Sequence, residues 1–112
     1  MLRSFVLSSI ILLSACSAID SPEKRYYIAN EAYIGLLRVA IEYKRECVTF
    51  PTESCKANVE KIQQGIRVTN KAFDMADRVF INGDDPFYRL AVTDAENAVK
   101  LLNTLVTEAN GG

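Results

Sequence analysis

Three cysteines carry the most distinctive chemistry in this sequence, because a thiol can be acylated, bind a metal ion or form a disulfide. Cys16 directly follows Leu13-Ser14-Ala15, at the end of a short apolar stretch, Phe5–Leu13, that comes after Arg3. A positive residue, a short apolar run and small residues before a cleavage point are typical of an export signal. The sequence therefore predicts that residues 1–15 are removed and that Cys16 becomes the first residue of the mature chain.

The tetrapeptide Leu13-Ser14-Ala15-Cys16 resembles the lipobox of bacterial lipoproteins. The resemblance implies that the Cys16 thiol takes a diacylglyceryl group, that signal peptidase II cuts before it, and that acyl chains anchor the mature protein. Ser17 stands where inner-membrane members of that class carry aspartate, which implies the outer membrane, with the protein facing the periplasm. An ordinary secretory signal and an uncleaved membrane helix are the alternatives. The run from Phe5 to Ile19 contains four serines and is shorter than the roughly 20 apolar residues of a spanning helix.

Cys47 and Cys55 are the other two thiols, and an exported chain carries them into an oxidising compartment. At this spacing we expect one disulfide at a turn between two helices, with two free thiols as the alternative. A zinc site would need more ligands, and the sequence has no histidine. We therefore expect no metal and no other cofactor.

No catalytic constellation is recognisable, because without histidine a serine or cysteine nucleophile lacks its commonest base. Ser17, Ser21 and Ser54 stand where a tether or helix caps account for them. Asn82-Gly83-Asp84-Asp85 lacks the alternating ligands of a calcium loop and suits a helix stop followed by a cap. Without Arg3 the chain has 12 basic and 14 acidic side chains, which argues against a nucleic-acid partner. The sequence thus predicts a protein that is not an enzyme.

Start and stop signals bound three amphipathic segments. The expected helices run from Pro22 to about Cys47, from about Ser54 to Asn82-Gly83, and from Pro86, capped by Asp85, to about Ala109. Long helices with short turns give an all-α fold, a three-helix antiparallel up-down-up bundle with the disulfide at the first helix–helix turn. The expected organisation is a lipoprotein signal peptide at 1–15, a lipidated tether at 16–21 and a helical bundle domain at 22–112.

Apolar residues recur at intervals of three and four in each segment and predict the faces that turn inward. In the first segment these are Tyr27, Ile34, Leu37, Ile41 and Val48, with Tyr26, Tyr33, Leu36 and Ala40 widening the stripe. In the second they are Cys55, Val59, Ile62, Ile66, Thr69, Phe73, Ala76 and Phe80. In the third they are Tyr88, Ala91, Ala95, Ala98, Leu102, Leu105 and Ala109.

The first segment is apolar around more of its circumference than a three-helix core needs, and it holds four of the five tyrosines. Such a surplus suits a partner surface, a self-association face or membrane contact. The candidate partner-binding residues are Tyr26, Tyr33, Leu36 and Tyr43. The alternative places Tyr27 and Tyr33 in the core and leaves Tyr26 and Tyr43 partly exposed.

Tyrosines followed by a cysteine, a proline, a second cysteine and a long helix resemble the pattern of small, largely uncharacterised helical lipoproteins of proteobacteria and their prophages. The residues that carry this resemblance are Tyr33, Tyr43, Cys47, Pro51, Cys55, Val59, Ile62 and Asn70-Lys71-Ala72. The arrangement is also similar to secretin pilotins, disulfide-bonded helical lipoproteins that hold a partner helix in a groove, although this chain has one helix fewer. We therefore expect a non-enzymatic, membrane-anchored envelope lipoprotein whose bundle binds a protein partner. The alternatives are a self-associating structural lipoprotein, forming a homo-oligomer, and a pilotin-like or phage-exclusion accessory factor.

Overall fold

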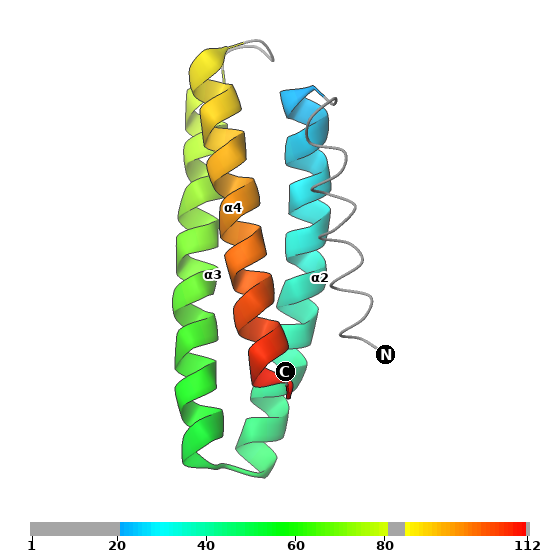
Figure 1. Ribbon diagram of the computed structural model, residues 1–112, viewed down its shortest axis with the longest axis vertical. Coiled ribbons are helices and arrows are strands. Elements are labelled where there is room, and N and C mark those ends of the chain that lie inside the picture. Colours follow the sequence, from blue (N-terminus) through cyan, green and yellow to red (C-terminus); the bar gives the residue numbers. More distant parts are fainter. Residues whose placement is uncertain (1–20, 81–84, 112) are drawn as a thin grey trace.

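The computed structural model describes residues 21–80 and 85–111, and within these ranges it contains helices and short connections but no strand. The helices are α2 (Pro22–Thr49), α3 (Glu53–Val79) and α4 (Pro86–Ala109). They lie side by side, with α2 and α4 running in one direction and α3 in the other (Figure 1). The predicted all-α, three-helix up-down-up bundle is confirmed. The predictions for Cys16 and for the Asn82-Gly83 stop lie outside the described residues.

Each helix begins at a residue whose side-chain oxygen accepts hydrogen bonds from free amides of the first turn. Ser21 and Asp85 do this for α2 and α4, as predicted, and a proline follows each of them. For α3 the capping residue is Thr52 rather than Ser54, because the Thr52 hydroxyl accepts from the Cys55 amide at 3.0 Å. The second helix therefore starts slightly earlier than the sequence suggested.

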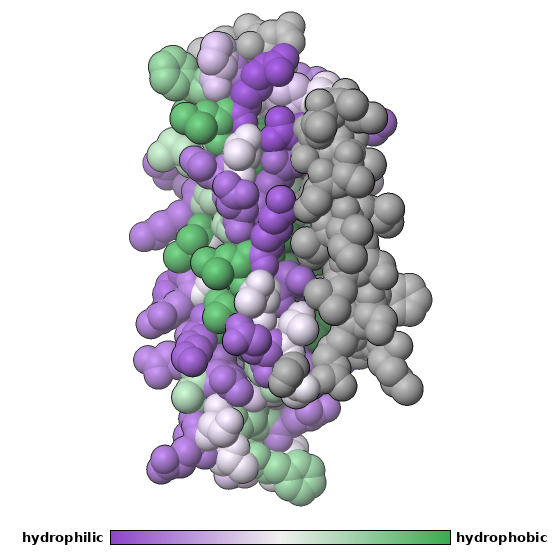
Figure 2. Space-filling view, viewed as in Figure 1, coloured by the Kyte–Doolittle hydropathy of each residue, from purple (hydrophilic) through white to green (hydrophobic). Residues whose placement is uncertain are grey.

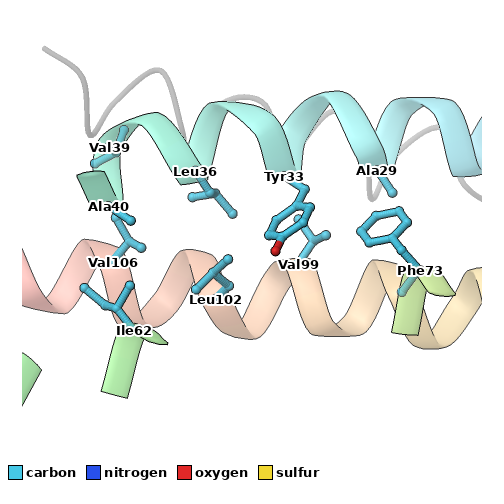
Figure 3. Close-up of a cluster of buried hydrophobic side chains, with 11 residues drawn as sticks. Ala29, Tyr33, Leu36, Val39, Ala40, Ile62, Phe73, Val99, Leu102 and Val106 are labelled. Carbon is cyan, nitrogen blue, oxygen red and sulfur yellow. The ribbon is translucent and has the colours of Figure 1, made fainter. Parts of the chain in front are cut away.

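Helix α4 packs against both other helices, whereas α2 and α3 contact each other less. Figure 3 shows side chains of α2 pointing toward Val99, Leu102 and Val106 of α4. The face of α4 that includes Ala95 and Leu102 belongs to the predicted stripe. A second buried face, with Val92, Val99 and Val106, was not predicted. Both faces are needed because α4 supplies core residues to two neighbours.

The inward face predicted for the first helix is wrong in its rotation. Tyr27, Ile34, Ile41 and Val48 are exposed, which also corrects the alternative that placed Tyr27 in the core. Three buried residues of α2, Tyr33, Leu36 and Ala40, were expected only to widen the stripe. The others were not in the predicted stripe: Pro22, Ala29, Val39 and Cys47. Because α2 has apolar side chains on two faces, the apolar pattern alone leaves its rotation open.

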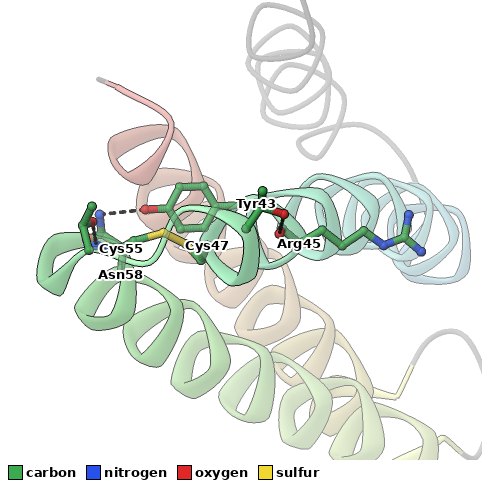
Figure 4. The surroundings of a disulfide bond; sticks show 7 residues. Tyr43, Arg45, Cys47, Cys55 and Asn58 are labelled. Atoms are coloured by element: carbon green, nitrogen blue, oxygen red, sulfur yellow. Dashed lines mark hydrogen bonds between the residues drawn. A yellow bond between two sulfur atoms is a disulfide. The ribbon is translucent and has the colours of Figure 1, made fainter.

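Cys47, near the end of α2, and Cys55, in the first turn of α3, form a disulfide, with their Cα atoms 5.7 Å apart. The predicted bond at the first helix–helix turn is confirmed. Beside it, Asn58 Nδ2 donates a hydrogen bond to the Tyr43 hydroxyl at 3.1 Å (Figure 4). We call this end of the bundle the disulfide end, and the opposite end, where α2 begins at Pro22 and α4 at Pro86, the tether end.

The contact between α3 and α4 is close at Gly65. A Cβ atom at that position would lie 3.0 Å from Cδ1 of Leu105 and 3.1 Å from Cδ1 of Leu102. One turn further on, the buried Thr69 hydroxyl donates to the Gly65 carbonyl at 2.7 Å, so this polar side chain is satisfied within α3. Absence of a side chain at Gly65 thus lets α4 press against α3.

Candidate functional site

A groove runs between α2 and α3 toward the disulfide end. Its first part is mostly apolar and is lined by Leu37, Ala40, Ile41, Tyr43, Lys44, Val59, Ile62, Gln63 and Ile66. A second hollow continues it and is lined by Lys44, Cys47, Val48, Pro51, Lys56 and Val59. We call the two hollows together the α2–α3 groove.

Two tyrosines of α2 form hydrogen bonds to α3 along the groove. The Tyr33 hydroxyl donates toward the Ile66 carbonyl at 3.3 Å and toward the Asn70 amide oxygen. Nearer the disulfide end, the Tyr43 hydroxyl accepts a hydrogen bond from Asn58. The two tyrosines therefore bridge α2 and α3 at two levels, and Leu37, Ile41 and Ile62 line the first hollow between these levels.

The groove has positive charge beside its apolar floor. Lys44 lines both hollows and Lys56 lines the second, whereas none of the residues that line either hollow is acidic. An apolar surface flanked by ammonium groups favours a ligand that is apolar on one side and acidic beside it. The groove therefore has a defined chemical preference.

The structure separates the four tyrosine and leucine residues that were predicted to bind a partner. Tyr33 and Leu36 are only 6% and 1% exposed, so their side chains are part of the core and are not available to a partner. Tyr26 is half-buried, and its hydroxyl donates to Asp77 Oδ1 of α3 at 2.7 Å. Tyr43 alone of the four lines the groove. Of the groove residues of α3, Val59, Ile62 and Ile66 were predicted only as core positions, and Lys56 and Gln63 were not predicted to lie inward.

Burial raises the pKa of three tyrosines above the ordinary value: Tyr26, Tyr33 and Tyr88. For Tyr26, the hydrogen bond to the Asp77 carboxylate raises the pKa further, because the anionic phenolate would face a negative charge. A phenol with a raised pKa keeps its proton and stays a hydrogen-bond donor at neutral pH. These three groups stabilise the bundle and are not poised for acid–base chemistry.

A buried ion pair near the tether end was missed by the sequence analysis. Arg25 Nε lies 3.2 Å from Oε2 of Glu96, and its Nη2 lies 2.5 Å from Oε1 and 2.9 Å from the Thr93 hydroxyl oxygen. The hydrogen bond to Glu96 raises the pKa of Arg25 despite its burial. The available signal was Glu96 itself, a charged residue four positions after Val92 and three before Val99 on a face that is otherwise apolar. This pair joins α2 to α4 and has a structural role.

Other chemistry is sparse in the part of the chain that the structure describes. No group of three or more histidine, cysteine, aspartate or glutamate side chains there could hold a metal ion. Across residues 21–80 and 85–111, no helix is both long and apolar enough to cross a bilayer. Asn103 is buried on α4 with an amide oxygen that has no hydrogen-bond partner, but it lines neither hollow of the groove.

Comparisons with known proteins return no relative: no family model, no curated protein and no solved structure matches the chain.

Proposed function

We propose that the chain is a non-enzymatic lipoprotein of the bacterial cell envelope, anchored in the outer membrane through Cys16, whose bundle binds a protein partner in the α2–α3 groove. The lipobox-like Leu13-Ser14-Ala15-Cys16 after a short apolar run supports the anchor. Ser17 supports the outer membrane. The groove is the observation that carries the binding function.

The shape and chemistry of the groove suit one class of partner, an amphipathic helix. A helix of the partner can lay its apolar side chains between α2 and α3, as in other helix-in-groove complexes. Leu37, Ile41 and Ile62 would receive its apolar face. Lys44 and Lys56 would lie beside its flank, where acidic residues are favoured.

Photo-cross-linking in intact cells tests this assignment. Gln63 is exposed and lines the groove, whereas the adjacent Gln64 is exposed on the other side of α3, toward α4. A photoreactive amino acid at Gln63 is expected to give an adduct, and the same group at Gln64 is the matched control. The cross-linked peptide, identified by mass spectrometry, should be an amphipathic helix with acidic residues on one flank. Equal amounts of adduct from Gln63 and Gln64 would contradict binding of the partner in the groove.

Two isoleucine variants test whether the partner binds in the α2–α3 groove. Ile41→Glu places a charge in the groove, whereas Ile34→Glu places the same charge on the same helix outside it. Both side chains are exposed, so both variants should fold. The adduct from Gln63 should disappear with Ile41→Glu and persist with Ile34→Glu. Loss of the adduct in both variants would argue against binding in the groove.

Self-association is the second candidate function, and one observation favours it. Tyr27, Ile34, Ile41 and Val48 form an exposed apolar stripe on α2 with a spacing of seven residues, which suits packing against a second copy of the same helix. A dimer built on this stripe would be dissociated by Ile34→Glu and by Ile41→Glu alike. Sedimentation of the Cys16→Ser protein, with and without these changes, distinguishes the two functions.

A further inference from the structure

Several large apolar side chains are exposed at the tether end. We call three of them, Phe80, Phe87 and Leu90, the apical patch. Phe87 and Leu90 are one turn apart at the start of α4, and the Phe80 ring packs edge-on against Tyr88, with centroids 4.9 Å apart. Figure 2 shows hydrophobic side chains at this end on the α3 side, among hydrophilic ones, and others further along the same face. Side chains in a helix lean toward its N-terminus, so Phe87 and Leu90 lean toward the tether end.

The chain that leads to the proposed lipid enters at the same end. Ser21 caps α2, and the first turns of α2 are fixed beside α4 and α3 by the Arg25–Glu96 pair and the Tyr26–Asp77 hydrogen bond. Figure 1 shows the start of α2, the end of α3 and the start of α4 at one end of the molecule. From Cys16 to Ser21 there are five residue steps, which span at most about 18 Å even when fully extended. An acyl group on Cys16 therefore keeps the tether end close to the bilayer.

Charged side chains of both signs surround the apical patch. Three acidic side chains there are already engaged within the protein: Asp77 accepts from Tyr26, Asp74 pairs with Arg78 at 3.0 Å, and Asp85 caps α4. Of these contacts, only the one between Asp74 and Arg78 pairs opposite charges. Glu23, Asp77 and Asp85 of the same end are acidic, and Lys24 and Arg89 are basic. The apical patch therefore presents apolar surface among charges of both signs.

The exposure of aromatic side chains alone does not distinguish the tether end from the disulfide end. Phe50, at the disulfide end, is 76% exposed, and Phe87 is 73% exposed. The difference is the distance from the anchor, because α2 has 28 residues and is about 42 Å long at 1.5 Å per residue. The tether can thus hold Phe87 at the bilayer while Phe50 projects away from it.

We propose that the apical patch contacts the headgroup region of the membrane, so that the bundle stands on its tether end. Apolar and aromatic side chains favour that region because they leave water there without entering the hydrocarbon core fully. This orientation rests on the proposed anchor at Cys16. It directs the disulfide end and the α2–α3 groove away from the bilayer.

Single tryptophans test the orientation directly, because the sequence contains none. The mature chain, residues 16–112, contains all three described helices. With Cys47 and Cys55 in a disulfide, Cys16 is left as the thiol to couple to a maleimide lipid. Vesicles of phosphatidylethanolamine and phosphatidylglycerol with brominated acyl chains then quench any indole that reaches them. Phe87→Trp is the reporter, and Phe50→Trp, equally exposed at the other end, is its control.

We expect Phe87→Trp to shift its emission to shorter wavelength and to lose most of it to the brominated lipid, while Phe50→Trp is unchanged. Leu90→Trp repeats the measurement at a second position, and far-UV circular dichroism verifies the fold of each variant. Quenching of both Phe87→Trp and Phe50→Trp would mean that the bundle lies along the membrane, which would overturn the proposal. Quenching of neither would overturn it as well. A native protein without acyl chains on Cys16, by mass spectrometry, would instead remove the anchor, which is a separate result.

Discussion

The guanidinium group of Arg25, at the start of α2, contacts both carboxylate oxygens of Glu96, which lies 71 residues later on α4. Their side chains are only 14% and 6% exposed, and Thr93 accepts a further hydrogen bond from the same arginine. Removing one partner of such a pair leaves an uncompensated buried charge, whereas replacing both with apolar residues can be neutral.

We therefore predict that Arg25→Met lowers the free energy of unfolding by about 3–5 kcal/mol and that adding Glu96→Leu restores most of it. Urea unfolding of the single and double variants measures both effects. The exposed Arg78–Asp74 pair of α3 is the control, since Arg78→Met should cost less than about 1 kcal/mol. Additive losses in the double variant would contradict the prediction.

Reduction of the Cys47–Cys55 bond should destabilise the bundle. Closing a loop of this length restricts the unfolded chain and contributes about 2.5 kcal/mol in the chain-entropy model. For a domain of this size such a loss lowers the melting temperature by roughly 10 °C. Thermal unfolding by circular dichroism, with and without reductant and in the Cys16→Ser background, checks the effect. Two free thiols in protein taken from the envelope, by mass spectrometry of unreduced peptides, would exclude the bond in the cell.

Two helical glycines should respond differently to alanine. Gly35 has no atom within 4 Å of the position where a Cβ would be, so Gly35→Ala should stabilise the protein by about 1 kcal/mol through helix propensity. At Gly65 the new methyl group meets Leu102 and Leu105, and crowding offsets the gain, so Gly65→Ala should be close to neutral. Gly65→Val should destabilise by about 1–3 kcal/mol. Equal stabilisation by both alanines in urea unfolding would show that the α3–α4 contact is looser than described.

Stability should fall at alkaline pH because of buried tyrosines. Tyr26, Tyr33 and Tyr88 have pKa values raised above 10.0 in the folded protein, so the unfolded chain loses protons at a pH where the folded chain keeps them. Their contribution is fully present below pH 10 and is lost as the pH rises beyond it. Urea unfolding between about pH 9 and about pH 11 in the Cys16→Ser background should show a steep decline, with a shallower one for Tyr26→Phe. Identical slopes for the two proteins would contradict the assignment of Tyr26.

Cys16→Ser tests the anchor. It should abolish labelling with radioactive fatty acid and leave the protein soluble or uncleaved, because it removes the thiol that we propose takes the lipid. The parent, with serine at position 17, should fractionate with the outer membrane. A Cys16→Ser protein that still sediments with membranes like the parent would mean that lipid is not the anchor, and recovery with inner-membrane vesicles would contradict the sorting.

Sequence alone was a good guide where apolar and charged residues alternate clearly. The second helix has its charges off one stripe, and its predicted positions Ile62, Thr69 and Phe73 are indeed buried. Phe80, predicted on the same stripe, is exposed because it lies just beyond the end of α3. The first helix has apolar residues on two faces, so periodicity could not decide between Ile34 and Tyr33. The rotation follows from partners far along the chain, which no local pattern contains.

The candidate site was less predictable than the fold. Tyr43 was expected at a surface and does line the groove. Lys44 and Lys56 could not be assigned to the groove from the sequence, because they line it only when α2 and α3 lie beside each other. The hydrogen bonds from Tyr33 to Ile66 and from Asn58 to Tyr43 likewise join residues of different helices, so they are a property of the assembled bundle.

The two buried faces of α4 also set the order in which this chain can acquire structure. Cys47 and Cys55 are close in sequence, so their bond can form while the rest of the chain is still extended. The core, in contrast, requires Val92, Val99 and Leu102 from the final helix. Because synthesis proceeds from the N-terminus, the core is incomplete until α4 has been made. A truncation before Pro86 should yield a disulfide-bonded α2–α3 hairpin without a complete core.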